Sequence, residues 1–104
     1  MDELEVISAL RALGEQTRWR VMRLLMSSGH GMAAGDIADA LKVRQNTLSS
    51  HIAVLTRCGL VDGNRQGRKI VYSADSRNAR RLAAQVSITL GHVSESTARN
   101  LFRK

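Results

Sequence analysis

The sequence predicts a mainly α-helical domain with one small β-hairpin, and three observations support this class. Residues 34–57 contain two stretches of helical hydrophobic periodicity separated by a turn of three residues. Residues 60–73 contain two β-prone runs on either side of a polar stretch. Residues 1–13 and 76–93 form amphipathic helical stretches at the two ends. With 104 residues, the chain is expected to form a single domain over residues 1–104.

Residues 34–41 are predicted to form the first helix of the central pair. Three apolar residues at helical spacing form its buried side, Ile37, Ala38 and Leu41. Residues 42–44 form the turn. Arg44 stands where serine or aspartate usually caps a helix, so the second helix is expected to begin without a side-chain N-cap.

The second helix of the pair has two faces of different chemistry. Its buried face is predicted from three residues, Leu48, Ile52 and Leu55. Its opposite face carries short side chains, Gln45, Asn46, Thr47, Ser49, Ser50 and Ala53. An ordinary solvated face, the alternative, usually carries lysine and glutamate, and this one carries neither. Because glutamine and asparagine form paired hydrogen bonds with adenine and serine bonds several base edges, this face is expected to read a DNA major groove.

A hairpin is predicted to follow the second helix. Cys58-Gly59 ends that helix, because glycine readily adopts the left-handed conformation that closes a helix. The β-prone runs, residues 60–61 and 69–73, flank a polar tip that carries three cationic side chains, Arg65, Arg68 and Lys69. Such side chains beside a reading helix are expected to reach phosphates or a minor groove. The alternative is a tip that is only solvated.

The order helix, turn, helix and hairpin predicts a winged helix-turn-helix DNA-binding module. In a dimer, two such helices enter successive major grooves about 10 base pairs apart, which predicts an inverted-repeat operator. Arg44 and the start of the second helix are hypothesised to contact a phosphate. His51, beside the apolar stripe, is expected either to pack between helices or to contact a phosphate.

The amphipathic ends of the chain are predicted to form a dimer interface. Its candidate residues are Leu4, Ile7 and Leu10 from the first helix and Leu82, Val86 and Leu90 from the last. Ser76 is expected to cap the last helix. The alternative is that both stripes fold back onto the chain's own core. Between the first helix and the central pair, Val21, Leu24 and Leu25 predict a scaffold helix. Its outer faces are expected to carry Arg18, Arg20 and Arg23, and Trp19 is expected to pack.

The net charge of +7 favours a polyanionic partner. An anionic membrane or RNA would also suit this charge. However, no apolar run approaches the length that spans a bilayer, and one Phe, one Trp and one Tyr offer few stacking platforms for single strands. The acidic N-terminus differs from a secretory signal peptide, so the expected location is the cytoplasm.

Four segments resemble the ArsR/SmtB family of bacterial winged-helix repressors. They are Leu13–Leu25, Gly35–Leu41, Gln45–Leu55 with Cys58–Val61, and the hairpin segment Gly67–Tyr72. The resemblance covers nearly the whole chain. It implies a homodimer, with the first and last helices at the interface. It also implies a repressor that occupies a promoter and releases it when a metal or another inducer binds.

The family's metal-binding residues are incomplete in this sequence. Where its arsenic, lead or cadmium sensors carry a Cys-x-Cys pair, this chain has Ala33 and Gly35. Of the zinc type's two pairs on the last helix, His92 and Glu95 match one, whereas Ala79 and Arg81 occupy the other. We therefore expect no metal and no cofactor, and the inducer is left open. A metal response through His92 and Glu95 remains the alternative.

The remaining candidate functions are a redox switch at Cys58, an enzyme and a protein-binding module. Cys58, the single cysteine, is expected to fill space at the helix end, with a redox switch as the alternative. His30 is expected to be solvated. The sequence contains no phosphate-binding glycine loop and no hydrolase or metalloprotease motif, which argues against an enzyme. A winged-helix module that binds protein should expose large apolar residues on its second helix, and residues 45–53 present none on the polar face.

Overall fold

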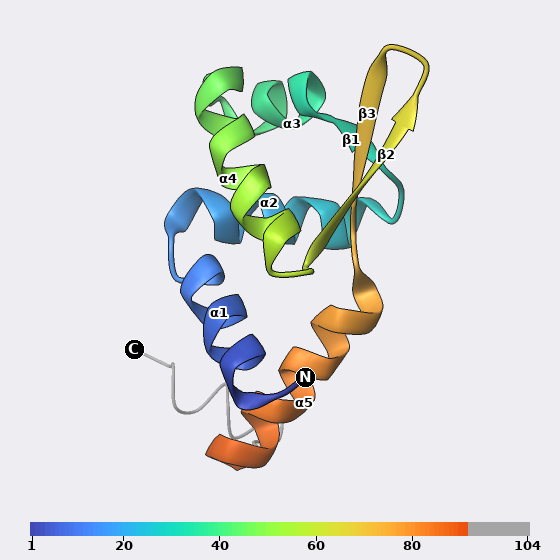
Figure 1. Cartoon of the computed structure of the whole chain (residues 1–104). Helices are drawn as coiled ribbons and strands as arrows, with labels where there is room; N and C mark the ends of the chain where they lie inside the picture. Colours follow the sequence, from blue (N-terminus) through green and yellow to red (C-terminus); the bar gives the residue numbers. More distant parts are fainter. Residues whose placement is uncertain (92–104) are drawn as a thin grey trace.

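The structure is a computed structural model, and it describes residues 1–91 of the 104. Its helices and strands follow one another as α1 (Glu3–Leu13), α2 (Gln16–Ser28), β1 (Met32–Ala33), α3 (Ala34–Leu41), α4 (Gln45–Arg57), β2 (Val61–Gln66), β3 (Lys69–Ala74) and α5 (Ser76–Leu90). The helix-turn-helix α3–α4 and the hairpin lie together at one end of the molecule, whereas α1 and α5 lie at the other (Figure 1). The predicted class, mainly helical with a small hairpin, is confirmed.

The core forms where the predicted apolar faces of the helices meet. Leu48, Ile52 and Leu55 of α4 are buried, as expected, together with Ile37 and Ala38 of α3. Leu41 is only half-buried. The other buried apolar residues are Ala9, Ala12, Val21, Met22, Leu25, Leu60, Val61 and Leu82. Burying a large aliphatic side chain stabilises the fold by about 1.5–3 kcal/mol, so this cluster holds α4 on the scaffold.

The turn between α3 and α4 depends on one residue in an unusual conformation. Lys42 has φ 57° and ψ 45°, in the left-handed region, and it ends α3. Directly after it, the Val43 amide donates to the Ala38 carbonyl at 3.0 Å. Val43 packs, half-buried, against the core. Arg44 then adopts an extended backbone, and its side chain makes no capping hydrogen bond, as expected from the sequence.

The hairpin is longer and more regular than the sequence predicted. β2 and β3 pair antiparallel up to Gln66 opposite Lys69, so only Gly67 and Arg68 form the turn. Residues 62–66, expected to belong to a polar tip, are therefore part of a strand. Backbone hydrogen bonds stabilise this pairing even though residues 62–66 are exposed. Gly67 has φ 66°, which glycine adopts without steric cost.

A third strand was not anticipated from the sequence. β1 pairs antiparallel with β3, with Met32 opposite Tyr72 and Ala33 opposite Val71, which gives the sheet order β1–β3–β2. Two residues are too few to show strand periodicity. β1 leads directly into α3, so the sheet joins the middle of β3 to the start of the helix-turn-helix.

Several expectations for the scaffold and the last helix were wrong. Arg18 and Arg20 are half-buried between helices instead of facing outward. Arg18 donates to the Ala12 carbonyl at 2.6 Å, and Arg20 donates to the Leu41 carbonyl at 3.1 Å. Arg23 is exposed as expected. Conversely, Trp19 is 50% exposed instead of packed.

The start and the apolar stripe of α5 also differ from expectation. The N-cap is Asp75, not Ser76, because its carboxylate accepts from the Asn78 amide at 3.0 Å. Leu82, expected at a dimer interface, is only 5% exposed and belongs to the chain's own core. Val86 packs partly against that core, whereas Leu90 is exposed. The stripe of α5 is therefore divided between the core and the surface.

Candidate nucleic-acid interface

The polar face of α4 is open to solvent. All of its expected reading residues are exposed: Gln45, Asn46, Thr47, Ser49, Ser50 and Ala53. Some of their polar atoms are used locally. The Ser49 hydroxyl donates to the Gln45 carbonyl at 2.9 Å, and Asn46 Oδ1 accepts from the Thr47 amide at 2.9 Å. The Ser49 oxygen can still accept a hydrogen bond, and the Asn46 amide nitrogen can still donate one.

The start of α4 favours an anion. Arg44 is exposed, and the first turn of α4 contains no acidic residue. The free N–H groups of a helix start carry partial positive charge and bind anions. Asn46 Oδ1 occupies the Thr47 amide, but Arg44 gives no side-chain cap, so the amides of Gln45 and Asn46 remain available to a phosphate.

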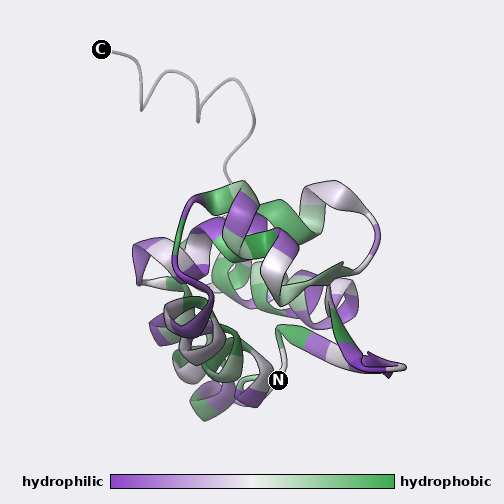
Figure 2. Cartoon of the chain, turned by 90° about the horizontal axis from the view of Figure 1, so that it is seen from above, coloured by the Kyte–Doolittle hydropathy of each residue, from purple (hydrophilic) through white to green (hydrophobic). Residues whose placement is uncertain are grey.

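The cations of the hairpin are also exposed. Arg65, Arg68 and Lys69 lie on the part of the hairpin farthest from α5. Figure 2 shows hydrophilic residues at this projecting tip. Because the strands pair up to Gln66 and Lys69, these cations are carried by an ordered ladder and not by a long loop.

One groove joins the start of α4 to the hairpin. It has a volume of about 470 Å³, and its walls bring together Gln45 and Ser49 of the reading face with Arg68 and Lys69 of the hairpin. The remaining lining residues are Ala33, Ala34, Gly35, Asp36, Ile70 and Tyr72. The other expected DNA contacts, Arg44, Asn46, Thr47, Ser50 and Arg65, lie outside this lining. Two cations face one carboxylate, Asp36, so the lining is net positive.

Sequence reasoning missed part of this groove. Asp36, Ile70 and Tyr72 line it but were not singled out. Strand alternation offers one signal, since Ile70 and Tyr72 are two residues apart and therefore share a face of β3. For Asp36 the only signal is its place in the first turn of α3.

His51 faces the interior of the domain. It is half-buried, and its Nδ1 lies 3.2 Å from Arg18 Nη1 and 3.6 Å from Glu15 Oε2. Hydrogen bonding from the Arg18 amide lowers the pKa of the Glu15 carboxyl, and the Thr17 amide and the Arg18 side chain lower it further. Of the two roles expected for His51, packing between helices agrees with this placement, and phosphate contact stays a prediction.

The described part of the chain, residues 1–91, contains no cluster of three or more His, Cys, Asp or Glu side chains that could hold a metal ion. Ala33 and Gly35 lie in the groove, and Arg81 is exposed on α5. His92 and Glu95 lie outside the described residues. Cys58 ends α4 half-buried, and its thiol donates to the Leu55 carbonyl at 3.3 Å.

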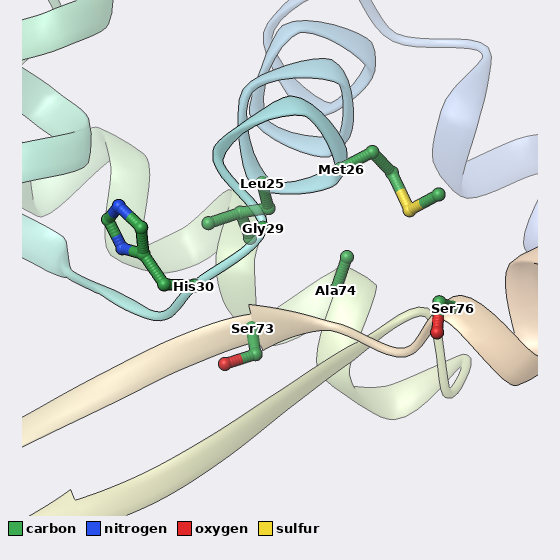
Figure 3. Close-up of a pocket in the computed structure, with 7 residues that line it drawn as sticks. All are labelled: Leu25, Met26, Gly29, His30, Ser73, Ala74 and Ser76. Carbon is green, nitrogen blue, oxygen red and sulfur yellow. The ribbon is translucent and has the colours of Figure 1, made fainter.

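A smaller pocket lies between the end of α2 and the junction of β3 with α5. It measures about 190 Å³ and is lined by Leu25, Met26, Gly29, His30, Ser73, Ala74 and Ser76 (Figure 3). His30 is its only titratable lining group. The histidine is exposed, as expected, and its Nδ1 lies 3.0 Å from the Gly31 carbonyl. The polar side chains that line this pocket are one imidazole and two hydroxyls.

Comparison with known proteins gives the family. A helix-turn-helix domain family matches residues 13–64. An ArsR-like transcriptional regulator from Rhodococcus sp. RHA1 superposes with a TM-score of 0.73 and is 28% identical, covering 85% of this chain and 80% of that one. The chain belongs to the ArsR/SmtB family. A homodimeric winged helix-turn-helix DNA-binding domain from Mycobacterium bovis superposes on this ArsR/SmtB chain with a TM-score of 0.67 and is 25% identical, covering 86% of this chain and 88% of that one.

A curated relative matches over only part of its own length and of this chain. The HTH-type transcriptional regulator NmtR of Mycobacterium tuberculosis is 36% identical over 69 residues, which are 66% of this chain and 56% of NmtR. The chain thus spans little more than half the length of that relative. Among residues 1–91, no helix combines the length and apolar character needed to cross a membrane.

Proposed function

We propose that this ArsR/SmtB chain is a sequence-specific DNA-binding transcriptional regulator that acts as a homodimeric repressor at an inverted-repeat operator. The groove between α4 and the hairpin carries this proposal, because side chains that can hydrogen-bond base edges and cations that can bind phosphates line the same surface. Gln45 and Ser49 supply hydrogen bonds for base edges, and Arg68 and Lys69 supply charge for the backbone. Arg44, Asn46, Thr47, Ser50 and Arg65 are proposed as flanking contacts.

The homodimer is supported by apolar surface on the two terminal helices. Leu4, Ile7 and Leu10 of α1 and Ile88 and Leu90 of α5 are exposed in the single chain. Exposed apolar side chains gathered on neighbouring elements mark an interaction surface. Pairing two copies through α1 and α5 leaves both copies of α4 free to enter successive major grooves.

Two other functions receive less support. A protein-docking role for α4 would need large apolar side chains on its exposed face, and Gln45 to Ala53 presents short polar ones there. The relatives are named as transcriptional regulators, which supports a regulatory role over an enzymatic one. A DNA partner supports the location in the cytoplasm that was expected from the sequence.

The proposal is tested by fluorescence anisotropy of the purified protein on its own upstream DNA and on scrambled DNA. A salt series and parallel samples with zinc are included. A preference of about a thousandfold for the upstream DNA, unchanged by zinc, supports a regulator that answers to a non-metal signal or to none. Equal binding to both DNAs, steeply weakened by salt, contradicts sequence-specific regulation. Release by zinc would support a metal response, for which His92 and Glu95 would be the first candidates.

A further inference from the structure

One arginine joins three helices in the interior of the domain. Arg18, near the start of α2, donates from Nε to the Ala12 carbonyl in the last turn of α1. Its Nη1 lies 3.2 Å from Nδ1 of His51 in the middle of α4. Its backbone N–H donates at 2.9 Å to Glu15, the N-cap of α2. The end of α1, the start of α2 and α4, the proposed recognition helix, are thus linked through a single residue.

We infer that Arg18 and His51 form a positioning contact that fixes the placement of α4 relative to α1. Arg18 touches no part of the groove, so it is a positioning residue and not a DNA contact. The contact itself does not depend on the proposed function, but its consequence for DNA binding rests on that function. If α1 lies at the dimer interface, the contact also sets the separation of the two recognition helices.

The contact supplies a directional constraint that the apolar core lacks. Leu48, Ile52 and Leu55 hold α4 by hydrophobic burial, which is not directional and tolerates small shifts along the helix axis. A hydrogen bond is directional and weakens steeply outside a narrow range of distance and angle. A shift of α4 by one residue, about 1.5 Å, would break a contact between Arg18 and His51 that now spans 3.2 Å.

The chemistry of the pair requires arginine and an acceptor on the imidazole. The guanidinium is always charged and has no acceptor, so it donates and His51 Nδ1 accepts. Its Nε and Nη1 point in fixed directions, which lets them reach Ala12 and His51 at the same time. A lysine would keep the charge but could not reproduce this fixed pair of donors. The Glu15 carboxylate also attracts the Arg18 guanidinium, which helps to keep it in place.

The direct test measures the separation of α1 and α4 in the free protein. Spin labels are placed on two exposed positions, Ser8→Cys on α1 and Ala53→Cys on α4, in a Cys58→Ser background. Labelled chain is diluted with unlabelled chain, so that pulsed electron paramagnetic resonance reports distances within one chain. Arg18→Lys is expected to broaden or shift the distance distribution. The matched control, Arg23→Lys on the exposed face of the same helix, is expected to leave it unchanged.

A second variant guards against a trivial loss of folding. His51→Phe keeps a ring of similar size in the half-buried site but removes the acceptor for Arg18. The double variant Arg18→Lys/His51→Phe should broaden the distribution no more than the worse single variant, because both remove the same contact. An unchanged distribution in either folded single variant overturns the inference, as does a double variant whose effect is the sum of the two.

DNA binding gives the readout that a merely structural role would not move. Operators are compared whose half-sites are one base pair closer or farther apart than the optimum. Wild-type protein should show one preferred spacing, and Arg18→Lys should lose that preference while keeping its salt-dependent binding to random DNA. If Arg18→Lys keeps the spacing preference, the inference is overturned, whereas the proposed function is not. Absence of operator preference in wild type contradicts the proposed function, while the label distances still decide whether Arg18 positions α4.

Discussion

The side-chain amide of Asn78 donates a 2.9 Å hydrogen bond to the backbone carbonyl of Gly59. This bond joins the first turn of α5 to the residue that follows the C-cap of α4. A second bond, from the Asp75 amide to the Leu60 carbonyl at 2.8 Å, lies beside it. The end of α4 is therefore attached to α5, just as its middle is attached to α2 through His51.

Gly59→Ala is expected to destabilise the protein more than the same change at Gly67. Both glycines are left-handed, with φ of 82° and 66°, so alanine costs about 1–2 kcal/mol at each. At Gly59 the new Cβ would also lie only 3.1 Å from Asn78 Nδ2, whereas at Gly67 nothing lies within 4 Å. Displacing Asn78 loses a hydrogen bond worth about 1 kcal/mol more. Chemical denaturation measures both free energies of unfolding, and equal losses would contradict the role given to Asn78.

The sequence predicted the elements whose evidence is local. Leu48, Ile52 and Leu55 recur at helical spacing, so α4 and its buried face could be placed from the order of residues alone. β1 could not be predicted, because its two residues become a strand only by pairing with Val71 and Tyr72, about 40 positions later.

Periodicity also shows that a face is apolar without showing what covers it. On α5, Leu82 is covered by the chain's own core and Leu90 by nothing in the described structure. For a charged residue such as Arg18, the sequence likewise does not show which groups it contacts. Its position on the helix gave no sign that its partners are a carbonyl of α1 and a histidine of α4.

Gln45→Ala is expected to weaken operator binding by about 1–3 kcal/mol and to relax sequence preference. Gln45 lines the groove at the start of α4, where an amide can reach a base edge. Random DNA offers no matching base pattern, so binding to it should change little. Anisotropy titrations on operator and scrambled DNA measure both affinities. Equal losses on the two DNAs would show that Gln45 does not read sequence.

Arg68→Ala is expected to weaken operator and random DNA alike. Arg68 is an exposed cation of the hairpin turn, and it lines the same groove from the opposite wall. Each lost phosphate contact lowers the slope of log affinity against log salt by roughly one. Arg23→Ala removes an exposed arginine outside the groove and serves as the control. A loss of affinity for the operator alone would show that Arg68 contacts bases and not phosphates.

Glu15 is expected to give the protein an acid-sensitive part of its stability. Its folded pKa is lowered from the ordinary value of 4.5, chiefly by the Arg18 amide, so folding favours the carboxylate. The stabilisation is therefore complete above about pH 4.5 and is lost as the pH falls through the folded pKa. In Glu15→Gln the free energy of unfolding should fall less between pH 6 and pH 3, whereas Glu3→Gln, a surface control, should follow wild type. An unchanged pH profile in Glu15→Gln would mean that the cap contributes no acid sensitivity.

Two leucines on α5 should separate folding from dimer formation. Leu82 is 5% exposed and Leu90 is 77% exposed, although both belong to the same apolar stripe. Leu82→Ala leaves a cavity in the chain's own core and should cost about 2–5 kcal/mol of folding stability. Leu90→Ala removes little intrachain contact and should leave the stability of the monomer nearly unchanged. Analytical ultracentrifugation should instead show a weaker dimer.

A charged substitution at the proposed interface tests the dimer more strongly than the change of Leu90 to alanine. Leu4 on α1 is 77% exposed, so Leu4→Glu places a carboxylate on the proposed interface without disturbing the core. A dimer would have to bury two unpaired charges across its symmetric contact, which is costly, so the variant should sediment as a monomer with an unchanged circular dichroism spectrum. Met26→Glu introduces the same charge on the exposed side of α2 and should remain dimeric. A Leu4→Glu protein that stays dimeric would remove α1 from the interface, and a Met26→Glu monomer would place the interface on α2 instead.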